Sequence, residues 1–473
     1  MSMRQLQWFT LLIIISLSGC FDAYAQPGDL DTTCGVNGIV TMNMFTNGSS
    51  ESEDYIRSVT VAPDNGPIYI GGESSDPYLS SYSTGFLAAR LNSDGSPDTT
   101  FGTDGRVLVH IGSWMDGAND LILTPSGILL AGYTASIFES DIALIRLNSD
   151  GTLDNTFGIG GKVVLHLEQI GVATAVAVQA DGKILVVGNE QTASGSPIQP
   201  VVIRLLADGS PDASFGNGGV LSFQFGGNPS SSSVTALATH VDSSGQTDKI
   251  IVGGYANYGG TDYFAVSRLN MDGTFDTTFN GSGTSVLPGD VITGGGNARV
   301  TSLQVNNDDS LIAAGSVDNS GGGFSTVIAV RYNLDGSMDT GFGNNGVLVA
   351  TYTSPAGAAA NLAGENTEDL TMVVTSTDAD NGQYAFAATR FFLASGMIDD
   401  RFGWIGNAFV PFNVIPGYAY IFANTSSVYQ WTIGYTYNGV VYPGLDRVLA
   451  AGQSVINNST DLVMAAISAG DCQ

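Results

Sequence analysis

Internal repetition is the feature that most limits how this 473-residue chain can fold. A segment with the pattern D-G-[ST]-x-D-x-[TS]-F-G-x-x-G-x-V recurs along the chain, and a truncated copy opens it at 28–40 (GDLDTTCGVNGIV). A Phe marks each copy except the first, which has Cys, and the markers stand at 34, 101, 157, 215, 279, 342 and 402. The steps between markers are 56 to 67 residues. The sequence therefore contains seven units of similar length.

Each unit shows the same series of short apolar stretches separated by Gly and Asp turns. In the third unit the stretches are 162–167, 174–179, 183–188, 201–206 and 220–224, the first of which ends the unit before. Alternating apolar positions and β-branched residues are typical of strands. A four-stranded unit of about 60 residues is too small to bury its faces alone and must stack on its neighbours. The sequence predicts an all-β fold, with 26–473 forming a single seven-bladed β-propeller of four-stranded antiparallel blades. The alternative, a straight β-solenoid, usually has far shorter coils.

Charge excludes several classes of partner. The chain has 44 acidic residues against 15 Lys and Arg, a formal net charge of −29. Such a protein repels nucleic-acid phosphates and anionic lipid headgroups. We therefore expect neither nucleic acid nor a membrane surface as partner, apart from a lipid anchor.

Residues 1–25 are typical of an export signal, with one positive charge, the apolar run 8–17 and then small residues. Two cleavage sites compete. Residues 17–20 (LSGC) resemble a lipobox, in which Cys20 is lipidated, whereas Ala23-Tyr24-Ala25 fits ordinary cleavage after residue 25. The sequence predicts an exported protein, either an outer-membrane lipoprotein or a secreted or periplasmic one.

The ends of the exported chain are predicted to meet. The first unit supplies one strand at 39–44, while the last supplies three, at 427–435, 447–452 and 461–468. Pairing of the terminal strands completes the last blade and removes a free sheet edge. Because export favours disulfides, we expect a Cys34–Cys472 bridge at this junction.

An Arg and an Asp recur at fixed repeat positions, and we expect them to form bidentate, partly buried ion pairs. The Arg residues are Arg90, Arg146, Arg204, Arg268, Arg331 and Arg390, with Ala466 in the seventh copy. The Asp residues are Asp98, Asp154, Asp212, Asp276, Asp339 and Asp399, preceded by Asp31, which we expect to be unpaired.

Catalytic and metal motifs are missing from the sequence. It has no HExxH, GxSxG, P-loop or CxxC, and its three histidines (His110, His166 and His240) lack a nucleophile context or matched ligand positions. We expect no metal site. Asp-Gly turns fit a purely structural role, and Ca2+ on some Asp-rich loops is left open as the only cofactor.

The repeated segment resembles the delta-60 repeat family of exported bacterial proteins over nearly all of 28–471. The resemblance implies a propeller-like repeat fold and export. It implies no catalytic residues.

The predicted blades place variable loops on one face and uniform Asp-Gly turns on the other. Binding residues usually lie on variable loops held by a rigid scaffold. The candidates on that face are the exposed aromatics Trp114, Tyr133, Tyr255 and Tyr258, with Asp262 beside them. We expect a monomeric, non-enzymatic module that binds an envelope or extracellular protein or glycan. The alternative is a carbohydrate- or ester-active enzyme with its site in the central channel.

Overall fold

The computed structural model describes residues 34–42, 44–45, 52–62, 66–75, 83–112, 114–167, 169–293, 295–318, 324–355, 360–364, 369–377, 384–399, 407–411, 435–437, 440–442, 447–456 and 459–468. In this part of the chain the secondary structure is almost entirely β. The one helix found there is α1 (Gly289–Ile292), so no helix among the described residues is long and apolar enough to cross a membrane.

The described residues form six four-stranded antiparallel sets, in each of which the strands pair in chain order. The first set is β2 (Asp54–Val61), β3 (Ile68–Ser75), β4 (Thr84–Leu91) and β5 (Arg106–Val109), and the second is β6 (Met115–Thr124), β7 (Gly127–Ala135), β8 (Ser140–Asn148) and β9 (Lys162–Leu165). The third set is β10 (Ile170–Val178), β11 (Ile184–Gln191), β12 (Gln199–Leu205) and β13 (Val220–Ser222). The fourth set is β14 (Ser231–Val241), β15 (Thr247–Tyr258), β16 (Thr261–Asn270) and β17 (Thr284–Leu287). The other two are β18 (Ala298–Val305) to β21 (Val347–Pro355), with β19 (Leu311–Asp318) and β20 (Phe324–Tyr332); and β22 (Ala360–Gly364) to β25 (Asn407–Pro411), with β23 (Asp369–Thr377) and β24 (Tyr384–Phe392). The all-β prediction and the four-stranded antiparallel sets are confirmed.

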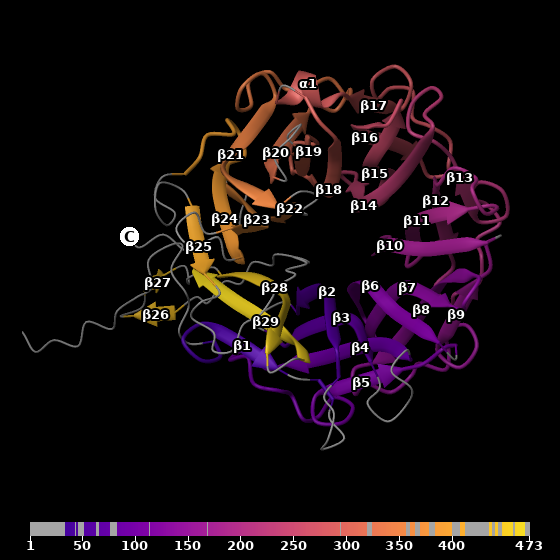
Figure 1. Cartoon of the computed structure of the whole chain (residues 1–473), viewed down its shortest axis with the longest axis vertical. Coiled ribbons are helices and arrows are strands. Elements are labelled where there is room, and N and C mark those ends of the chain that lie inside the picture. The colour runs from indigo at the N-terminus through magenta and orange to yellow at the C-terminus, as the bar shows by residue number, and fades with distance from the viewer. Residues whose placement is uncertain are drawn as a thin grey trace, which may run out of the picture.

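The sets follow one another around a central opening (Figure 1). The first strand of each set lies innermost and contacts the first strand of the next, from β2 through β6, β10, β14 and β18 to β22. Five of these inner strands, β2, β6, β10, β14 and β18, each contain a β-bulge near the middle. Three of the bulged side chains bond the backbone of the next inner strand: Asn119 to Ala173 O, Thr174 to Val234 O and Thr235 to Val300 O. These bonds hold the wall of the opening together.

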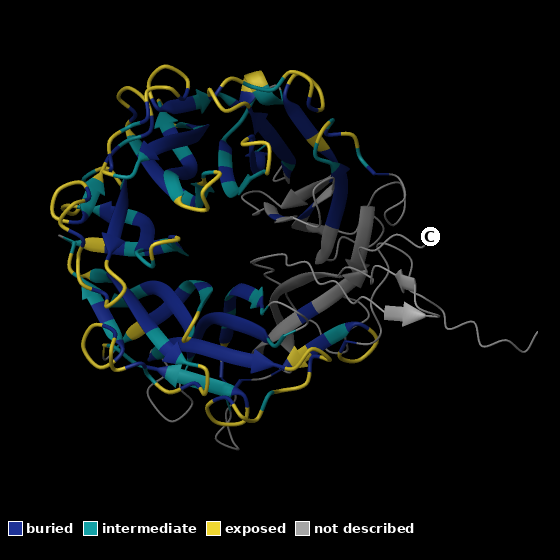
Figure 2. Cartoon of the chain, turned by 180° about the vertical axis from the view of Figure 1, so that it is seen from behind, coloured by how far each residue is buried: buried dark blue, intermediate teal, exposed yellow. Residues whose placement is uncertain are grey.

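Apolar side chains are buried between neighbouring sheets rather than in one common core. One such cluster joins Phe86 of β4 to Leu130 and Ile145 of the next sheet, and comparable clusters occupy the following junctions. Strands are buried and their connecting loops exposed, as Figure 2 shows from the back. This packing is expected when each unit can bury its faces only against its neighbours.

The terminal strands lie in one sheet. Strand β1 (Ile39–Met42) pairs antiparallel with β29 (Ser459–Ser468), which pairs with β28 (Arg447–Ile456). Cys34, Val40 and Met464 are packed against the β2–β4 sheet. Register places Ala466 opposite Leu449, where β12 has Arg204 opposite Leu185. A further pair, β26 (Tyr435–Tyr437) and β27 (Val440–Tyr442), forms a separate two-stranded sheet.

The repeated Asp-Gly turns lie on the marker residue of the unit before. The Asp208 carbonyl accepts a hydrogen bond from Gly158 N at 2.8 Å, and Gly209 has φ +88°. A Cβ on Gly209 would come within 2.9 Å of the Phe157 ring, so this position needs glycine for both its conformation and its close approach. Cys34 takes the place of the marker Phe under Gly95 at the first junction.

Five of the repeated Arg residues join their own turn to the turn of the next unit: Arg90, Arg146, Arg204, Arg268 and Arg331. Arg204 donates from Nε to Asp212 Oδ2 at 2.8 Å and from Nη2 to Ser214 Oγ at 2.9 Å. Its Nη1 donates to the carbonyl of Met271 in the next unit, and its guanidinium lies 4.8 Å from the Phe215 ring centroid. We call this arrangement the arginine clamp. The other Arg–Asp contacts are Arg90–Asp98 (2.8 Å), Arg146–Asp154 (2.7 Å), Arg268–Asp276 (2.9 Å), Arg331–Asp339 (3.5 Å) and Arg390–Asp399 (2.6 Å).

Four of these pairs are not bidentate, which corrects the sequence-based expectation. In the pairs of Arg90, Arg146, Arg204 and Arg268, the second carboxylate oxygen accepts the N–H and hydroxyl of the Thr or Ser two residues on. The outer guanidinium nitrogen therefore meets a hydroxyl instead. In Arg331, Nη2 bonds Asp308 rather than Asp339, so here too the sequence missed the main partner.

Several predicted features lie outside the described residues. They are the export signal with Cys20, Cys472 and hence the Cys34–Cys472 bridge, Asp31, and the strand at 427–434.

Candidate binding face

The β-sheet order puts two kinds of connection on opposite faces. Hairpins between first and second strands and between third and fourth strands lie on one face, which we call the turn face. The remaining connections, which vary in length and composition, lie on the other, which we call the loop face. The arginine clamps stabilise the turn face, so the loop face is the candidate binding surface.

Tyr133 lies in a polar cluster at the rim of the central opening on the loop face. Its hydroxyl donates to Glu73 Oε2 at 2.5 Å, and Arg57 Nη2 donates to Glu73 Oε1 at 3.2 Å. Burial, and then the neighbouring Glu73 carboxylate, raise the pKa of the Tyr133 hydroxyl well above its usual value. The hydroxyl therefore remains a hydrogen-bond donor at any physiological pH.

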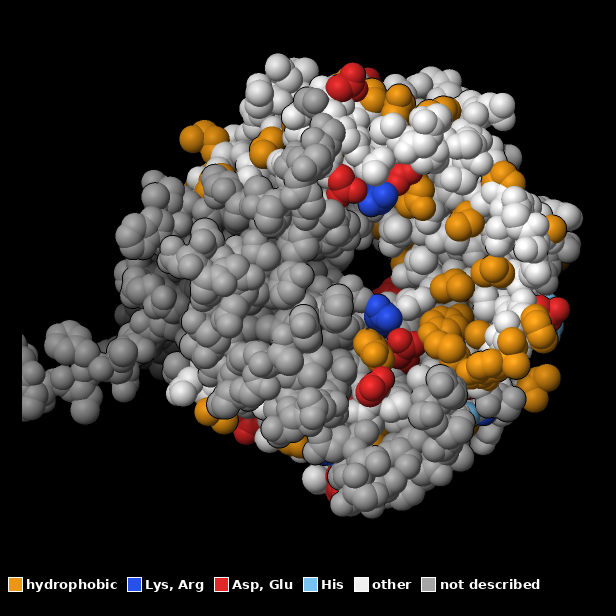
Figure 3. All heavy atoms as spheres, viewed as in Figure 1, with side chains coloured by type: hydrophobic (Ala, Val, Ile, Leu, Met, Phe, Trp, Pro, Cys, Tyr) orange, Lys and Arg blue, Asp and Glu red, His pale blue; other side chains and the backbone are white. Residues whose placement is uncertain are grey.

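Tyr255 and Asp262 belong to a second cluster, between the β14–β17 and β18–β21 sheets. Arg299 donates from Nε to Asp262 Oδ2 at 2.7 Å and from Nη1 to Asp318 Oδ2 at 3.2 Å. The same guanidinium lies 5.4 Å from the centroid of the Tyr255 ring. Asn257 Nδ2 donates to the second Asp262 oxygen at 2.7 Å. Figure 3 shows basic and acidic side chains gathered in this way around the opening.

The other two predicted aromatics lie apart from these clusters. Trp114 is partly buried, and among the described residues its indole N–H has no hydrogen-bond partner. Tyr258 packs on Tyr263 with ring centroids 5.1 Å apart and donates to Phe225 O at 3.4 Å. All four aromatics are half-buried rather than exposed; Tyr133, Tyr255 and Tyr258 are covered in part by Glu73, Arg299 and Tyr263, respectively.

A group of exposed apolar side chains lies beside the first cluster. Phe138 is 80% exposed and Ile137 is 65% exposed, both in the β7–β8 loop. Strand pairing brings Met115 opposite Ala135, and Ile170 opposite Ser140, at the two ends of that loop. We call Met115, Ile137, Phe138 and Ile170 the apolar patch; Figure 3 shows orange side chains concentrated on one side of the face.

The exposed apolar side chains of the turn face, such as Val36, Ile159, Leu206 and Met397, belong to turns of different units. Single exposed apolar residues are normal, whereas a contiguous patch marks a contact surface.

Sequence reasoning missed Arg57, Glu73, Arg299 and Asp318. A signal was available for the two arginines, because they are among the few basic residues outside the repeated clamp position. Their partners could not be read from the sequence, since each cluster combines residues from two neighbouring units. Phe138 and Ile137 were present in a variable loop but carried no periodic signal.

One carboxylate in the channel wall has an unusual protonation equilibrium. Asp120 accepts hydrogen bonds from Ser58 Oγ (3.0 Å), Leu121 N (2.8 Å) and Val176 N (2.9 Å). Burial raises the pKa of Asp120 to about 6, although these three bonds oppose the rise. Its bonds join three inner strands, so its position is accounted for by structure. No group of three or more metal-ligating side chains occurs in the described ranges.

Comparison with known proteins identifies the repeat. A family described as "Domain of unknown function (DUF5122) beta-propeller" matches residues 64–101, 125–157, 179–215, 246–279 and 307–342, and each match ends on a marker Phe. No curated protein matches the chain in sequence.

Solved structures resemble the chain only distantly. The polysaccharide lyase Uly1 is 11% identical with a TM-score of 0.45, over 88% of this chain and 90% of its own. Sqt1 of Chaetomium thermophilum is 12% identical with a TM-score of 0.40, over 88% and 96%. The extracellular domains 1-2 of Drosophila Semaphorin 1b are 7% identical with a TM-score of 0.39, over 74% and 78%. Similarity at this level does not extend to activity. The family matches, together with the order of the strands, show that the chain is a β-propeller repeat protein.

Proposed function

We propose that the chain is an exported, seven-bladed β-propeller that binds a partner protein through the apolar patch on its loop face. The terminal sheet supports the seventh blade, because β1 pairs with β29 over four residues and both pack against the β2–β4 sheet. In this proposal, the pairing of β1 with β29 covers a free sheet edge and closes the ring, so that the propeller has two distinct faces.

The observation that carries the binding proposal is the concentration of exposed apolar side chains on one side of one face. Exposed aliphatic and aromatic side chains next to a polar rim are typical of a protein-contact surface, in which a few anchors are buried by the partner. Tyr133, Glu73 and Arg57 provide that polar rim. Their mutual bonds fix their positions before binding, which lowers the ordering entropy lost on association.

Charge indicates the kind of protein partner. The chain carries a formal net charge of −29, so association is favoured for a partner whose contact surface has basic residues around an apolar anchor. A glycan is the less favoured ligand, because Phe138, Ile137 and Met115 offer it few hydrogen bonds.

Export and anchoring complete the proposal. Residues 1–25 direct the chain out of the cytoplasm, Cys20 is lipidated or removed, and a Cys34–Cys472 bridge ties the ends together. The protein acts as a monomer at the bacterial envelope or outside the cell.

Photo-crosslinking tests the proposed face. A benzoylphenylalanine is placed at Phe138 in one variant and at Ile159 in another; Ile159 is 90% exposed on the turn face and serves as a matched control. We expect the variant at position 138 to crosslink one envelope protein reproducibly. The double substitution Ile137→Ser, Phe138→Ser should abolish capture of that protein, while Ile159→Ser should not.

Equal labelling from both positions, or capture that survives the double substitution, would refute the proposal. A glycan array run in parallel distinguishes the ligand class: glycan binding that requires Phe138, without any protein partner, would also refute it.

A further inference from the structure

A cavity of about 260 Å³ opens on the turn face, at the junction of the β14–β17 and β18–β21 sheets. Its apolar part is formed by Ile251, Phe279, Val305 and Leu311, and its polar part includes His240, Asp248 and Asp309. The apolar patch lies on the opposite face, so this inference is independent of the proposed function.

The hairpin that borders the cavity departs from the repeat. Strands β14 and β15 have 11 and 12 residues, whereas the corresponding β10 and β11 have 9 and 8. The register skips Asp248, since His240 pairs with Lys249 and Val241 with Thr247. A bulge of this kind redirects a side chain. Here the Asp248 carboxylate reaches His240 Nδ1 at 2.5 Å.

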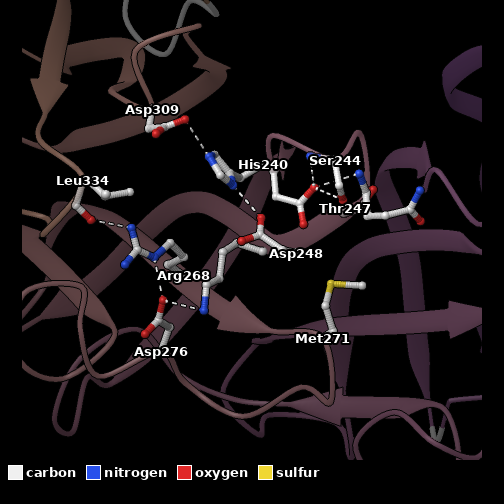
Figure 4. Close-up of polar contacts among 12 residues, drawn as sticks. His240, Ser244, Thr247, Asp248, Arg268, Met271, Asp276, Asp309 and Leu334 are labelled. Carbon is white, nitrogen blue, oxygen red and sulfur yellow. Dashed lines mark hydrogen bonds and ion pairs between the residues drawn. The ribbon is translucent and has the colours of Figure 1, made fainter.

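The facing turn also departs from the repeat. Asp309 has φ +63°, a left-handed conformation that Gly, Asn and Asp adopt more readily than other residues. The corresponding turn in the β10–β13 sheet has Gly182, with φ +81°, at this position. The Asp at this turn position places a carboxylate at the cavity, 2.9 Å from His240 Nε2. Figure 4 shows His240 held between Asp248 and Asp309.

The charged groups around the cavity pair with one another and leave the carboxylates of Asp248 and Asp309 accessible, with side chains 39% and 52% exposed. Lys249 Nζ and Arg268 Nε both contact Asp276 Oδ2, at 3.1 and 2.9 Å, so these two cations are paired within the protein. His240 bonds one oxygen each of Asp248 and Asp309. Among the contacts of the described residues, the second oxygen of each carboxylate accepts no hydrogen bond.

We propose that this cavity binds an alkylammonium group, with the ammonium on Asp248 and Asp309 and the alkyl chain over Ile251, Phe279, Val305 and Leu311. An aliphatic chain matches the apolar part, and the ammonium supplies donors to the two carboxylates. The volume suits a single side chain or a small amine rather than a larger ligand. The strongly acidic chain attracts cations and repels anionic ligands.

His240 couples this binding to pH. Burial lowers the pKa of His240, but hydrogen bonds to Asp248 and Asp309 outweigh that effect, so the pKa is above its ordinary value. The other charged groups near the imidazole are Asp242 of its own turn, Lys249 and Arg268. A proton on His240 neutralises part of the carboxylate charge and repels a bound ammonium, so affinity rises as the pH increases.

Isothermal titration of the folded protein with n-pentylamine at pH 8.5 and pH 6 tests the proposal. We expect binding at pH 8.5, a Kd at least about fivefold weaker at pH 6, and no comparable binding of 1-pentanol or pentanoate. Asp309→Gly should weaken binding about tenfold at pH 8.5. This variant folds, because glycine is the residue that suits φ +63°. Asp208→Asn, in a turn of another unit, is the matched control and should leave affinity unchanged.

His240→Gln should remove the pH dependence, whereas His166→Gln should not; His166 pairs with Asp141 at 2.8 Å elsewhere on the molecule. Acetyl-Gly-Lys-Gly-amide and its acetyl-lysine form distinguish the source of the amine. Tighter binding of the lysine peptide than of pentylamine assigns the cavity to a protein side chain, and the reverse assigns it to a small amine. Equal binding of pentanol or pentanoate, no binding of either amine, or full affinity in Asp309→Gly would overturn the proposal.

Discussion

The arginine clamp should contribute several kcal/mol to stability at each junction, and Arg204→Met is its most direct test. The Arg204 side chain is 4% exposed and that of Asp212 8% exposed. Replacing Arg204 by Met removes the bond to Asp212, the bond to Ser214 and the bond across the junction to Met271 O. It also removes the stacking of the guanidinium on Phe215.

Breaking a buried ion pair by removing one partner typically costs about 3–5 kcal/mol, because the remaining charge is left without compensation. Lys183 Nζ lies 3.3 Å from Asp212 and offsets part of that cost, so we expect a loss of about 3 kcal/mol. Arg204→Lys keeps the charge but loses the planar fork that reaches three acceptors, and should cost about 1–2 kcal/mol.

Urea unfolding followed by circular dichroism measures these differences. His166→Gln is the control: the His166 side chain is 80% exposed and makes one ion pair, with Asp141, so its loss should cost at most about 1 kcal/mol. If Arg204→Met unfolds within about 1 kcal/mol of His166→Gln, the clamp is a surface contact and the reasoning is wrong.

Three further predictions concern pH and backbone conformation. Hydrogen bonds and Arg204 hold the pKa of Asp212 below its usual value despite burial. The contribution of Asp212 to stability is therefore present above the unfolded pKa near 4 and is lost as the pH falls through the folded pKa. Urea midpoints that stay constant from pH 5 to pH 2 would contradict this prediction. Because the pKa of His240 is raised, its effect on stability has the opposite pH dependence. The contribution of His240 to stability is fully present below about pH 6.5 and is lost as the pH rises through the folded pKa. His240→Gln should remove this pH dependence from the stability profile. Gly151→Ala should destabilise the protein by at least about 1 kcal/mol more than Gly195→Ala. Both glycines have φ above +80°, but a Cβ at Gly151 would lie 2.7 Å from Gly102 N, whereas a Cβ at Gly195 would meet open space. Equal melting temperatures of the two variants would contradict this prediction.

The repeat made most of the fold predictable. In the third unit the four expected strands coincide with β10 to β13 within a few residues, because Asp-Gly turns limit each strand and alternating apolar positions set its register. The spacing of Arg204 and Asp212 follows from a tight turn that returns the chain beside the strand. A local pattern repeated in every unit carries this information without any knowledge of the neighbours.

Contacts between units could not be predicted in the same way. Arg204 also donates to the Met271 carbonyl of the next unit, a contact that depends on how the two sheets meet. The cluster of Arg57, Glu73 and Tyr133 combines two units, so its members have no fixed separation in the sequence. Such contacts depend on how the sheets are oriented, which no single repeat specifies.

The cavity at His240 shows a signal that the sequence did contain. Asp309 occupies a turn position held by Gly182 in another unit, and this departure from the repeat places a carboxylate where the other turn has no side chain. The prediction that the four aromatics are exposed was wrong because the sequence contained no signal for their burial. Loop composition says little about how far a Tyr packs into the end of a sheet.

Hydrogen exchange at β1 tests most directly whether the ends of the chain close the ring. Strand β1 pairs with β29 from Ile39 to Met42; the Ile39 amide also donates to Val36 O in the preceding turn, so the amides of Val40–Met42 report on the pairing. If the ring is closed in solution, the β1 amides that donate hydrogen bonds to β29 should exchange slowly. Their exchange should be as slow as that of the amides of β5, the corresponding fourth strand of the next sheet. Val463→Pro, opposite Thr41, should release them. Exchange of all β1 amides within seconds in the unsubstituted protein would show an open seam and would contradict the account.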